Sequence, residues 1–130
     1  MWKTLLLPLM VLVSLGLALL VLEWLYRLQL VDMYRPELHT FNPAQVLAPN
    51  AKPTLLVMGD SFTASRTSYA GILQDTLQEW RTINAAVSGT GVLQALYMAP
   101  KRFAQFHPAI FVYQVYVGND LFDIRYPMNW

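Results

Sequence analysis

The chain has 130 residues, of which 55% are hydrophobic and none is cysteine. The nine Lys and Arg are scattered and leave a formal net charge of +1 against eight Asp and Glu, so the charge pattern indicates neither a nucleic-acid partner nor an acidic one. Without cysteine there is no disulfide, CxxC redox pair or thiolate metal site, and no redox compartment is favoured.

The apolar, uncharged run from Thr4 to Leu22 is long enough to cross the hydrocarbon core of a bilayer as a helix. Lys3 resembles the basic start of an export signal, but the end of the run, from Ala18 to Tyr26, lacks the small residues of a cleavage site. We therefore predict residues 1–22 as an uncleaved transmembrane signal-anchor, with the rest of the chain on the extracytoplasmic side, periplasmic or extracellular. A cleaved signal and a buried core helix are the alternatives.

Residues 23–52 are predicted to form a juxtamembrane helix and then a linker. The helix is expected to run outward to about residue 35, because several apolar side chains fall partly on one face. Four prolines then punctuate a stretch with little periodicity, which is typical of a linker; they are Pro36, Pro43, Pro49 and Pro53. We expect His39 to be solvated in this linker, or alternatively to fold over the site described below.

From residue 53 onward, strand and helix patterns alternate. Strands are expected at residues 53–58, 82–87 and 109–117. The helical patterns between them are carried by Tyr69, Ile72, Leu73, Leu77 and Trp80, and by Leu93, Leu96, Tyr97 and Phe103. This alternation implies right-handed crossovers and a parallel sheet covered on both faces. The predicted fold class is α/β, preceded by one transmembrane helix.

Each predicted strand is followed by a small polar cluster. The clusters are Asp60-Ser61, Ser88-Gly89 and Asn119-Asp120. Because the carboxyl ends of parallel strands share one edge, three turns are expected to converge on one crevice, where such folds bind ligands. A serine that attacks an ester carbonyl needs donors aimed at the developing oxyanion, and backbone N–H groups with an Asn side chain can supply them.

Three ordered blocks, about 28 to 30 residues apart, make the pattern specific. They are Gly59-Asp60-Ser61, Asn84-Ala-Ala-Val-Ser-Gly89 and Gly118-Asn119-Asp120. Together they resemble the SGNH hydrolase superfamily, also called the GDSL esterase and lipase family. The resemblance runs from about Pro53 to Asp120. It implies a partial flavodoxin-like, three-layer α/β/α sheet, with residues 53–130 as the N-terminal part of an SGNH-like domain.

The resemblance implies Ser61 as the nucleophile. Its oxyanion hole would comprise the Ser61 and Gly89 backbone N–H groups and the Asn119 side-chain amide, with Asp60 and Asp120 as supporting or turn-shaping groups. The family's general base is a His in a carboxy-terminal Asp-x-x-His block. The sequence contains no such block, so we expect a domain truncated before it and inactive alone. For His107, just before the third strand, we expect a structural or surface role.

The implied reaction is ester hydrolysis or acyl (acetyl) transfer through an acyl-serine, on an ester-bearing small molecule, glycan or lipid, with no metal or organic cofactor needed. The alternative is a non-catalytic, membrane-anchored protein that binds a glycan or lipid or docks a protein partner. Ser61 as a mere turn or capping residue also stays open. A truncated sheet further predicts an exposed edge strand and poor solubility without a partner.

Overall fold

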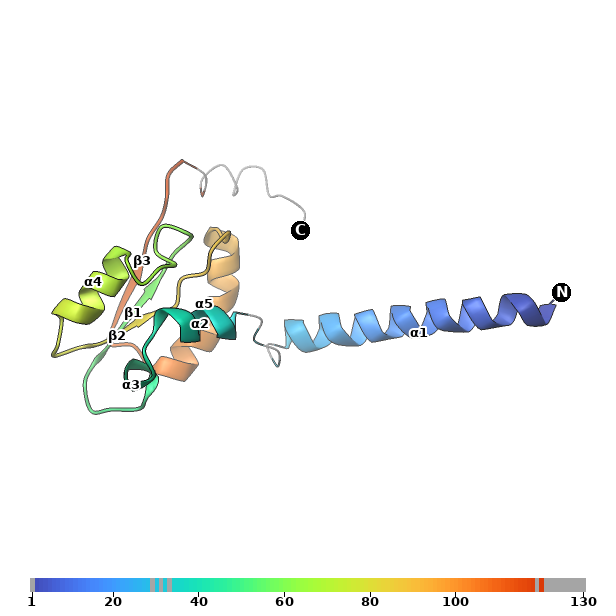
Figure 1. Cartoon of the computed structure of the whole chain (residues 1–130), viewed down its shortest axis with the longest axis horizontal. Coiled ribbons are helices and arrows are strands. Elements are labelled where there is room, and N and C mark those ends of the chain that lie inside the picture. The colour runs from blue at the N-terminus through green and yellow to red at the C-terminus, as the bar shows by residue number, and fades with distance from the viewer. Residues whose placement is uncertain (1, 29, 31, 33, 119, 121–130) are drawn as a thin grey trace. The chain divides into compact units, whose positions relative to one another are not determined.

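The structure, a computed structural model, describes residues 2–28, 30, 32, 34–118 and 120. The chain divides into two compact units, of which the second begins at Tyr34. The first contains one long apolar helix, and the second is a mixed α/β domain built on a small parallel sheet of three strands (Figure 1).

Helix α1, Trp2–Arg27, forms the described part of the first unit. Its stretch Leu6–Arg27 is long and apolar enough to cross a membrane, judged by length and composition. The side chains from Leu6 to Leu22 are all exposed, because the helix is apolar all round and has no partner in its own unit. The helix passes the predicted end of the anchor at residue 22 but stops before residue 35. A main-chain hydrogen bond from Leu30 N–H to Leu25 O (3.0 Å), between residues five apart, follows the end of the helix.

The predicted linker is wrong for residues 34–47, which belong to the folded domain. Two short helices form there, α2 (Arg35–Phe41) and α3 (Ala44–Leu47). Pro36 lies in the first turn of α2, where a helix needs no N–H donor, and Pro43 is the N-cap of α3. Leu38 is only 3% exposed and packs in the main hydrophobic core. The prolines therefore begin short helices instead of marking an unstructured connection.

The sheet confirms the predicted parallel arrangement. Its strands are β1 (Thr54–Met58), β2 (Arg81–Asn84) and β3 (Ile110–Tyr113), in the order β2-β1-β3, with β1 parallel to both neighbours. All five residues of β1 are buried, as a central parallel strand requires. β3 is shorter than the predicted 109–117, because β1 ends at Met58. The bond from Gln114 N–H to Met58 O (3.0 Å) is the last contact between the two main chains.

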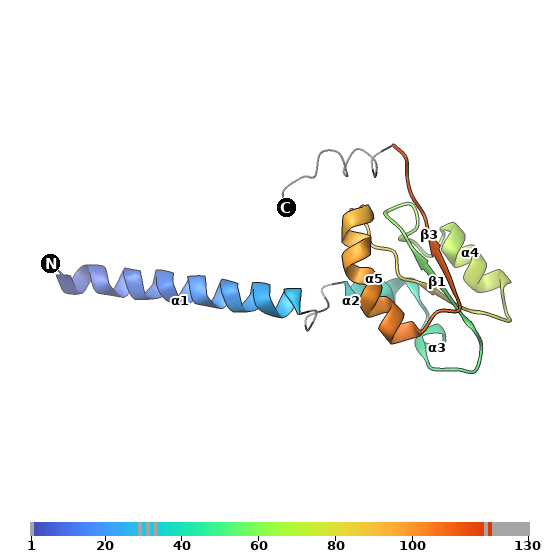
Figure 2. The same ribbon diagram turned by 180° about the vertical axis from the view of Figure 1, so that it is seen from behind.

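Helices cover both faces of the sheet, as Figures 1 and 2 show. On one face, Leu56 and Met58 of β1 share a core with Leu38 of α2 and with α5 (Val92–Phe106), which contributes Met98 and other residues. On the other face, Leu55 and Val57 pack against α4 (Tyr69–Thr76). Because the three strands are parallel, their carboxyl ends lie at the same end of the sheet.

Two apolar residues of the predicted helical patterns do not lie on buried faces. Ile72 in α4 is 61% exposed and Leu96 in α5 is 64% exposed. Both buried residues of α4 are small, whereas α5 buries small and large side chains. The buried positions are Ala70 and Gly71 in α4, and Ala95, Met98, Arg102 and Phe106 in α5. Within the described sheet β3 is an edge strand, and its Ile110 and Phe111 are exposed at 44% and 41%.

Candidate active site at the carboxyl ends of the strands

The turn after β1 holds Ser61 at the surface. Gly59 is packed so closely that a Cβ added to it would lie 2.6 Å from Thr63 Oγ1 and 2.9 Å from Gln114 Oε1. Those two side chains are themselves bonded, since Thr63 Oγ1 donates to Gln114 Oε1 at 2.7 Å. Thr63 is fully buried, whereas Ser61 is exposed. The turn is therefore fixed from below and presents its serine outward.

Asp60 has the geometry of a turn-forming residue. Its Oδ1 accepts the Phe62 N–H at 3.0 Å, and its main-chain carbonyl accepts the N–H groups of Thr63 (3.1 Å) and Ala64 (2.9 Å). The side chain is only 2% exposed, and its other oxygen, Oδ2, has no hydrogen-bond partner among the described residues. The contacts agree with the turn-shaping role expected from the sequence, and the supporting role in catalysis stays a prediction.

The two main-chain donors of the expected oxyanion hole lie on neighbouring strand ends. Val87 N–H donates to Gly59 O at 3.1 Å, and both Ser61 and Gly89 lie two residues beyond this bond. Gly89 has a φ of +74°, a conformation that favours glycine, and it is exposed. In the part of the chain that the structure describes, neither the Ser61 nor the Gly89 N–H donates a hydrogen bond, and the Ser61 hydroxyl is unbonded.

The segment after β3 reaches the same edge of the sheet. The rings of Phe62 and Tyr116 lie 4.7 Å apart between centroids, which joins the turn that carries Ser61 to this segment. Asp120 is fully buried and its Oδ2 accepts the Tyr116 N–H at 2.8 Å, while Oδ1 has no partner among described residues. Asn119, the expected side-chain donor of the oxyanion hole, lies outside the described residues.

Tyr113 at the end of β3 senses both buried carboxylates. Its partial burial, and then the negative charges of Asp120 and Asp60, raise its pKa from 10.0 to about 12. Burial disfavours the tyrosinate, and two carboxylates nearby disfavour it further. The charges of Asp60, from the first block of the sequence, and Asp120, from the third, thus act on the same Tyr113 hydroxyl.

We expect the stability of the domain to fall as the pH rises from about 10 to about 12. In this window an unfolded tyrosine has lost its proton whereas folded Tyr113 retains it, so the unfolded state binds fewer protons and the free energy of unfolding decreases with pH. Absorbance titration of tyrosinate should show one late step that Tyr113→Phe removes. Tyr69→Phe, a change at an exposed position, should retain it. A late step that survives in Tyr113→Phe would contradict the assignment.

A buried amide network supports the Ser61 turn, and sequence reasoning missed it. Asn42, at the end of α2, donates to Asn84 O at 2.7 Å and accepts the Asn84 N–H at 2.8 Å. Asn84 in turn donates from Nδ2 to the carbonyls of Thr63 (2.9 Å) and Ser65 (3.3 Å). The side chain of Asn42 thus pairs with the outer edge of β2, and Asn84 passes that support to the turn. The position of Asn84 in the second block was the available sequence signal.

Helix α2 also reaches the second block. Glu37 Oε2 accepts the N–H of Ser88 at 3.2 Å, directly before Gly89. The segment interpreted from sequence as a linker therefore contacts the turn before Gly89 directly and the turn that carries Ser61 through Asn84. Nothing in the local pattern of residues 36–43 indicates this, because the contacts span more than forty positions of the chain.

Among the described residues, neither histidine forms a hydrogen bond with Ser61. His39 is exposed on α2, where its Nε2 accepts a 3.5 Å bond from Arg35. His107 is the C-cap of α5, with a φ of +45°, and it precedes β3 at the end of the sheet opposite Ser61. The described residues also contain no group of three or more His, Asp or Glu that could hold a metal ion. Comparisons of the chain with protein-family models, curated proteins and solved structures gave no match.

Proposed function

We propose that this chain is a membrane-anchored serine ester hydrolase or acyl (acetyl) transferase of the SGNH type. The observation that carries the proposal is the exposed Ser61 after β1, with an unbonded hydroxyl and N–H, next in the sheet to the equally unbonded Gly89 N–H after β2. The strand order β2-β1-β3 adds support, because it is the order in which a flavodoxin-like sheet begins.

In the proposed reaction, Ser61 Oγ attacks the ester carbonyl carbon and the carbonyl electrons move to the oxygen. The N–H groups of Ser61 and Gly89 and the amide of Asn119 would hold this oxyanion. Collapse expels the alcohol and leaves an acyl-serine, which passes its acyl group to water in a hydrolase or to a second alcohol in a transferase. The general base is not assigned to either histidine, because among the described residues neither forms a hydrogen bond with Ser61, and His107 lies at the opposite end of the sheet.

The substrate is proposed to be an ester of a glycan, a lipid or another small molecule. We assign α1 as a single-pass anchor and the α/β domain to the extracytoplasmic side, because the run from Thr4 to Leu22 ends without a cleavage site. A domain held at a bilayer surface meets membrane lipids and surface glycans at high local concentration.

One observation favours a second function, that of a non-catalytic binding protein. A serine hydroxyl is a poor nucleophile until a base takes its proton, and among the described residues no histidine contacts Ser61. The same edge of the sheet would then bind a glycan, a lipid or a protein partner without converting it chemically.

A fluorophosphonate probe tests the nucleophile. Ser61 Oγ would attack phosphorus with loss of fluoride, so the full-length protein in membranes should label if a general base activates the serine. Ser61→Ala should lower labelling by a factor on the order of 100 or more, because the covalent bond cannot form. Ser88→Ala is the matched control, since Ser88 is also exposed at the same edge but carries no proposed role. Labelling should be retained there.

Labelling that persists in Ser61→Ala would overturn the nucleophile, and a wild type that labels no faster than Ser61→Ala would favour the binding protein. The side of the membrane is tested in the same experiment. A charged probe that cannot cross bilayers should label intact cells or spheroplasts as well as lysed ones. Labelling confined to lysed cells would place the domain in the cytoplasm.

A further inference from the structure

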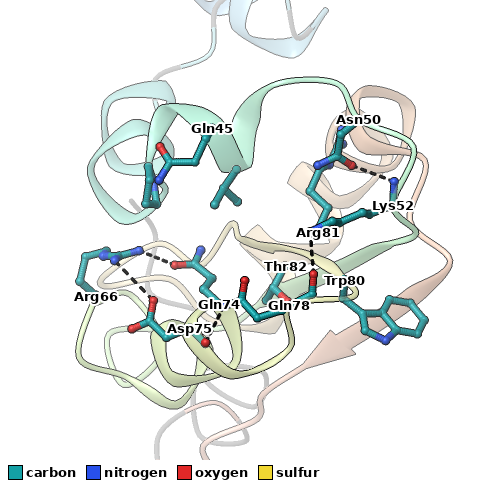
Figure 3. Close-up of a pocket in the computed structure, with 12 residues that line it drawn as sticks. Gln45, Asn50, Lys52, Arg66, Gln74, Asp75, Gln78, Trp80, Arg81 and Thr82 are labelled. Atoms are coloured by element: carbon teal, nitrogen blue, oxygen red, sulfur yellow. Dashed lines mark hydrogen bonds and ion pairs between the residues drawn. The ribbon is translucent and has the colours of Figure 1, made fainter.

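A polar hollow of about 360 Å³ lies along the outer edge of β2, away from Ser61. Its lining includes Gln45, Lys52, Arg66, Gln74, Arg81 and Thr82. Figure 3 shows Gln45 of α3 on one side and Gln74, Asp75 and Gln78 on the other, with Thr82 between them. The indole of Trp80 points away and packs on the core. The volume of the hollow suits a small molecule.

The hollow is rich in positive charge. Three basic side chains line it, Lys52, Arg66 and Arg81, against the single carboxylate of Asp75. The Arg66–Asp75 pair is long, at 3.9 Å, and both side chains are well exposed, so it neutralises little. Basic groups from three separate segments therefore face one small space in a chain whose net charge is only +1.

Two buried polar atoms at this hollow lack partners among the described residues. Thr82 is only 2% exposed, yet its Oγ1 has no hydrogen bond, and neither has Arg81 Nε. Buried polar groups are normally satisfied, and each orphan costs free energy. Arg81 Nε–H and the Thr82 hydroxyl are both donors, so an acceptor atom of a ligand would suit either of them once its side chain turns toward the hollow.

The edge of β2 is open beside these donors. Arg81 N–H donates to Pro53 O (2.9 Å) and Ala85 N–H to Val57 O (2.8 Å), so these residues face β1. By the alternation of a parallel ladder, the main chain of Thr82 faces outward. Two residues further along the strand, the side chain of Asn42 bonds the outward-facing main chain of Asn84. The open stretch is therefore too short for an added strand and leaves room only for a compact ligand.

We propose that this hollow binds a small oxyanion-bearing molecule, a carboxylate or a phosphate, independently of Ser61. Lys52 and Arg81 would meet its charge, and the Thr82 hydroxyl would donate to one of its oxygens. Lys52 is already ordered by a 2.6 Å bond from Nζ to Gln78 O, and Arg81 by its position 5.8 Å above the Phe106 ring. The side-chain amides around the rim can bind hydroxyl groups of the same molecule.

The test uses the full-length protein in detergent micelles, with inorganic phosphate and citrate as separate probes. Chloride at equal ionic strength is the reference. A probe at about ten times its dissociation constant should raise the unfolding midpoint by roughly 5 °C. Lys52→Gln should remove most of the shift, whereas Arg35→Gln, which removes an exposed charge outside the hollow, should keep it. The relative shifts with phosphate and citrate identify the preferred oxyanion.

Thr82→Val is a second test, which distinguishes ligand binding from a purely structural role of Thr82. Without ligand it should leave the midpoint unchanged or raise it, because it replaces an orphan hydroxyl by a methyl group of similar size. With ligand its shift should be smaller than that of the wild type. The proposal is overturned if neither probe stabilises the protein beyond chloride, or if Lys52→Gln and Arg35→Gln respond alike. Ser61→Ala should bind as the wild type does, which separates this site from the proposed catalysis.

Discussion

Replacing Gly71 with alanine is expected to destabilise the α/β domain by on the order of 3 kcal/mol or more. Gly71 lies in the first half of α4, where a Cβ would clash with the carbonyl oxygen of Arg66 and lie 2.7 Å from its carbon. Both are main-chain atoms, so no side-chain rotation relieves the clash. Either α4 or the turn that follows Ser61 must move.

The direction of this effect is the informative part. In an ordinary helix interior the change from glycine to alanine stabilises by about 1 kcal/mol, so a large loss reports the tertiary contact alone. Gly16→Ala is the matched control, because it makes the same change in α1, where nothing lies within 4 Å of the added Cβ. Urea unfolding of the full-length variants in micelles, followed by near-ultraviolet circular dichroism, measures both. An unchanged midpoint for Gly71→Ala would mean that α4 does not pack on the turn in this way.

Asn42→Ala is expected to cost roughly 3 kcal/mol of unfolding free energy. The side chain is 3% exposed and makes four hydrogen bonds. Nδ2 donates to the carbonyls of Leu38 (2.6 Å) and Asn84 (2.7 Å), and Oδ1 accepts from Asn84 N–H (2.8 Å) and Gln74 Nε2 (2.7 Å). Alanine would leave the buried main-chain N–H and C=O of Asn84 without partners. Buried groups without a hydrogen bond cost more free energy than the lost bonds themselves.

The same substitution should also slow fluorophosphonate labelling of Ser61, since Asn84 carries the support from Asn42 to the carbonyls of Thr63 and Ser65. Asn50→Ala is the control, because Asn50 is exposed and its side chain accepts only the local N–H of Lys52. It should change neither the urea midpoint nor the labelling rate. A variant Asn42→Ala as stable as Asn50→Ala would remove the network from the account of the fold.

Much of the architecture could be predicted from short-range patterns. The continuous apolar run of β1 predicts a central strand, and it is fully buried between two parallel neighbours. The uninterrupted run after Thr4 predicts a helix of membrane-spanning length, which α1 provides. Ser61 and Gly89 do lie beyond the carboxyl ends of adjacent strands, although β2 and β3 end earlier than predicted.

The helix faces could not be predicted in this way. Counting large apolar residues favours Ile72 and Leu96, yet close contact with the sheet selects small residues such as Ala70 and Ala95. Packing density depends on how near two backbones approach, and side-chain hydrophobicity alone does not report that distance.

Local patterns were enough to predict the alternation of strands and helices after residue 53, the apolar helix and the serine after a strand, because each depends on neighbours within a few residues. The place of α2 in the domain, the pairing of Asn42 with Asn84 across 42 positions and the gathering of basic side chains beside β2 depend on the tertiary structure. Contacts of that kind depend on how the chain closes on itself. Polar residues such as Asn42 look like turn or surface positions until the edge they satisfy is in place.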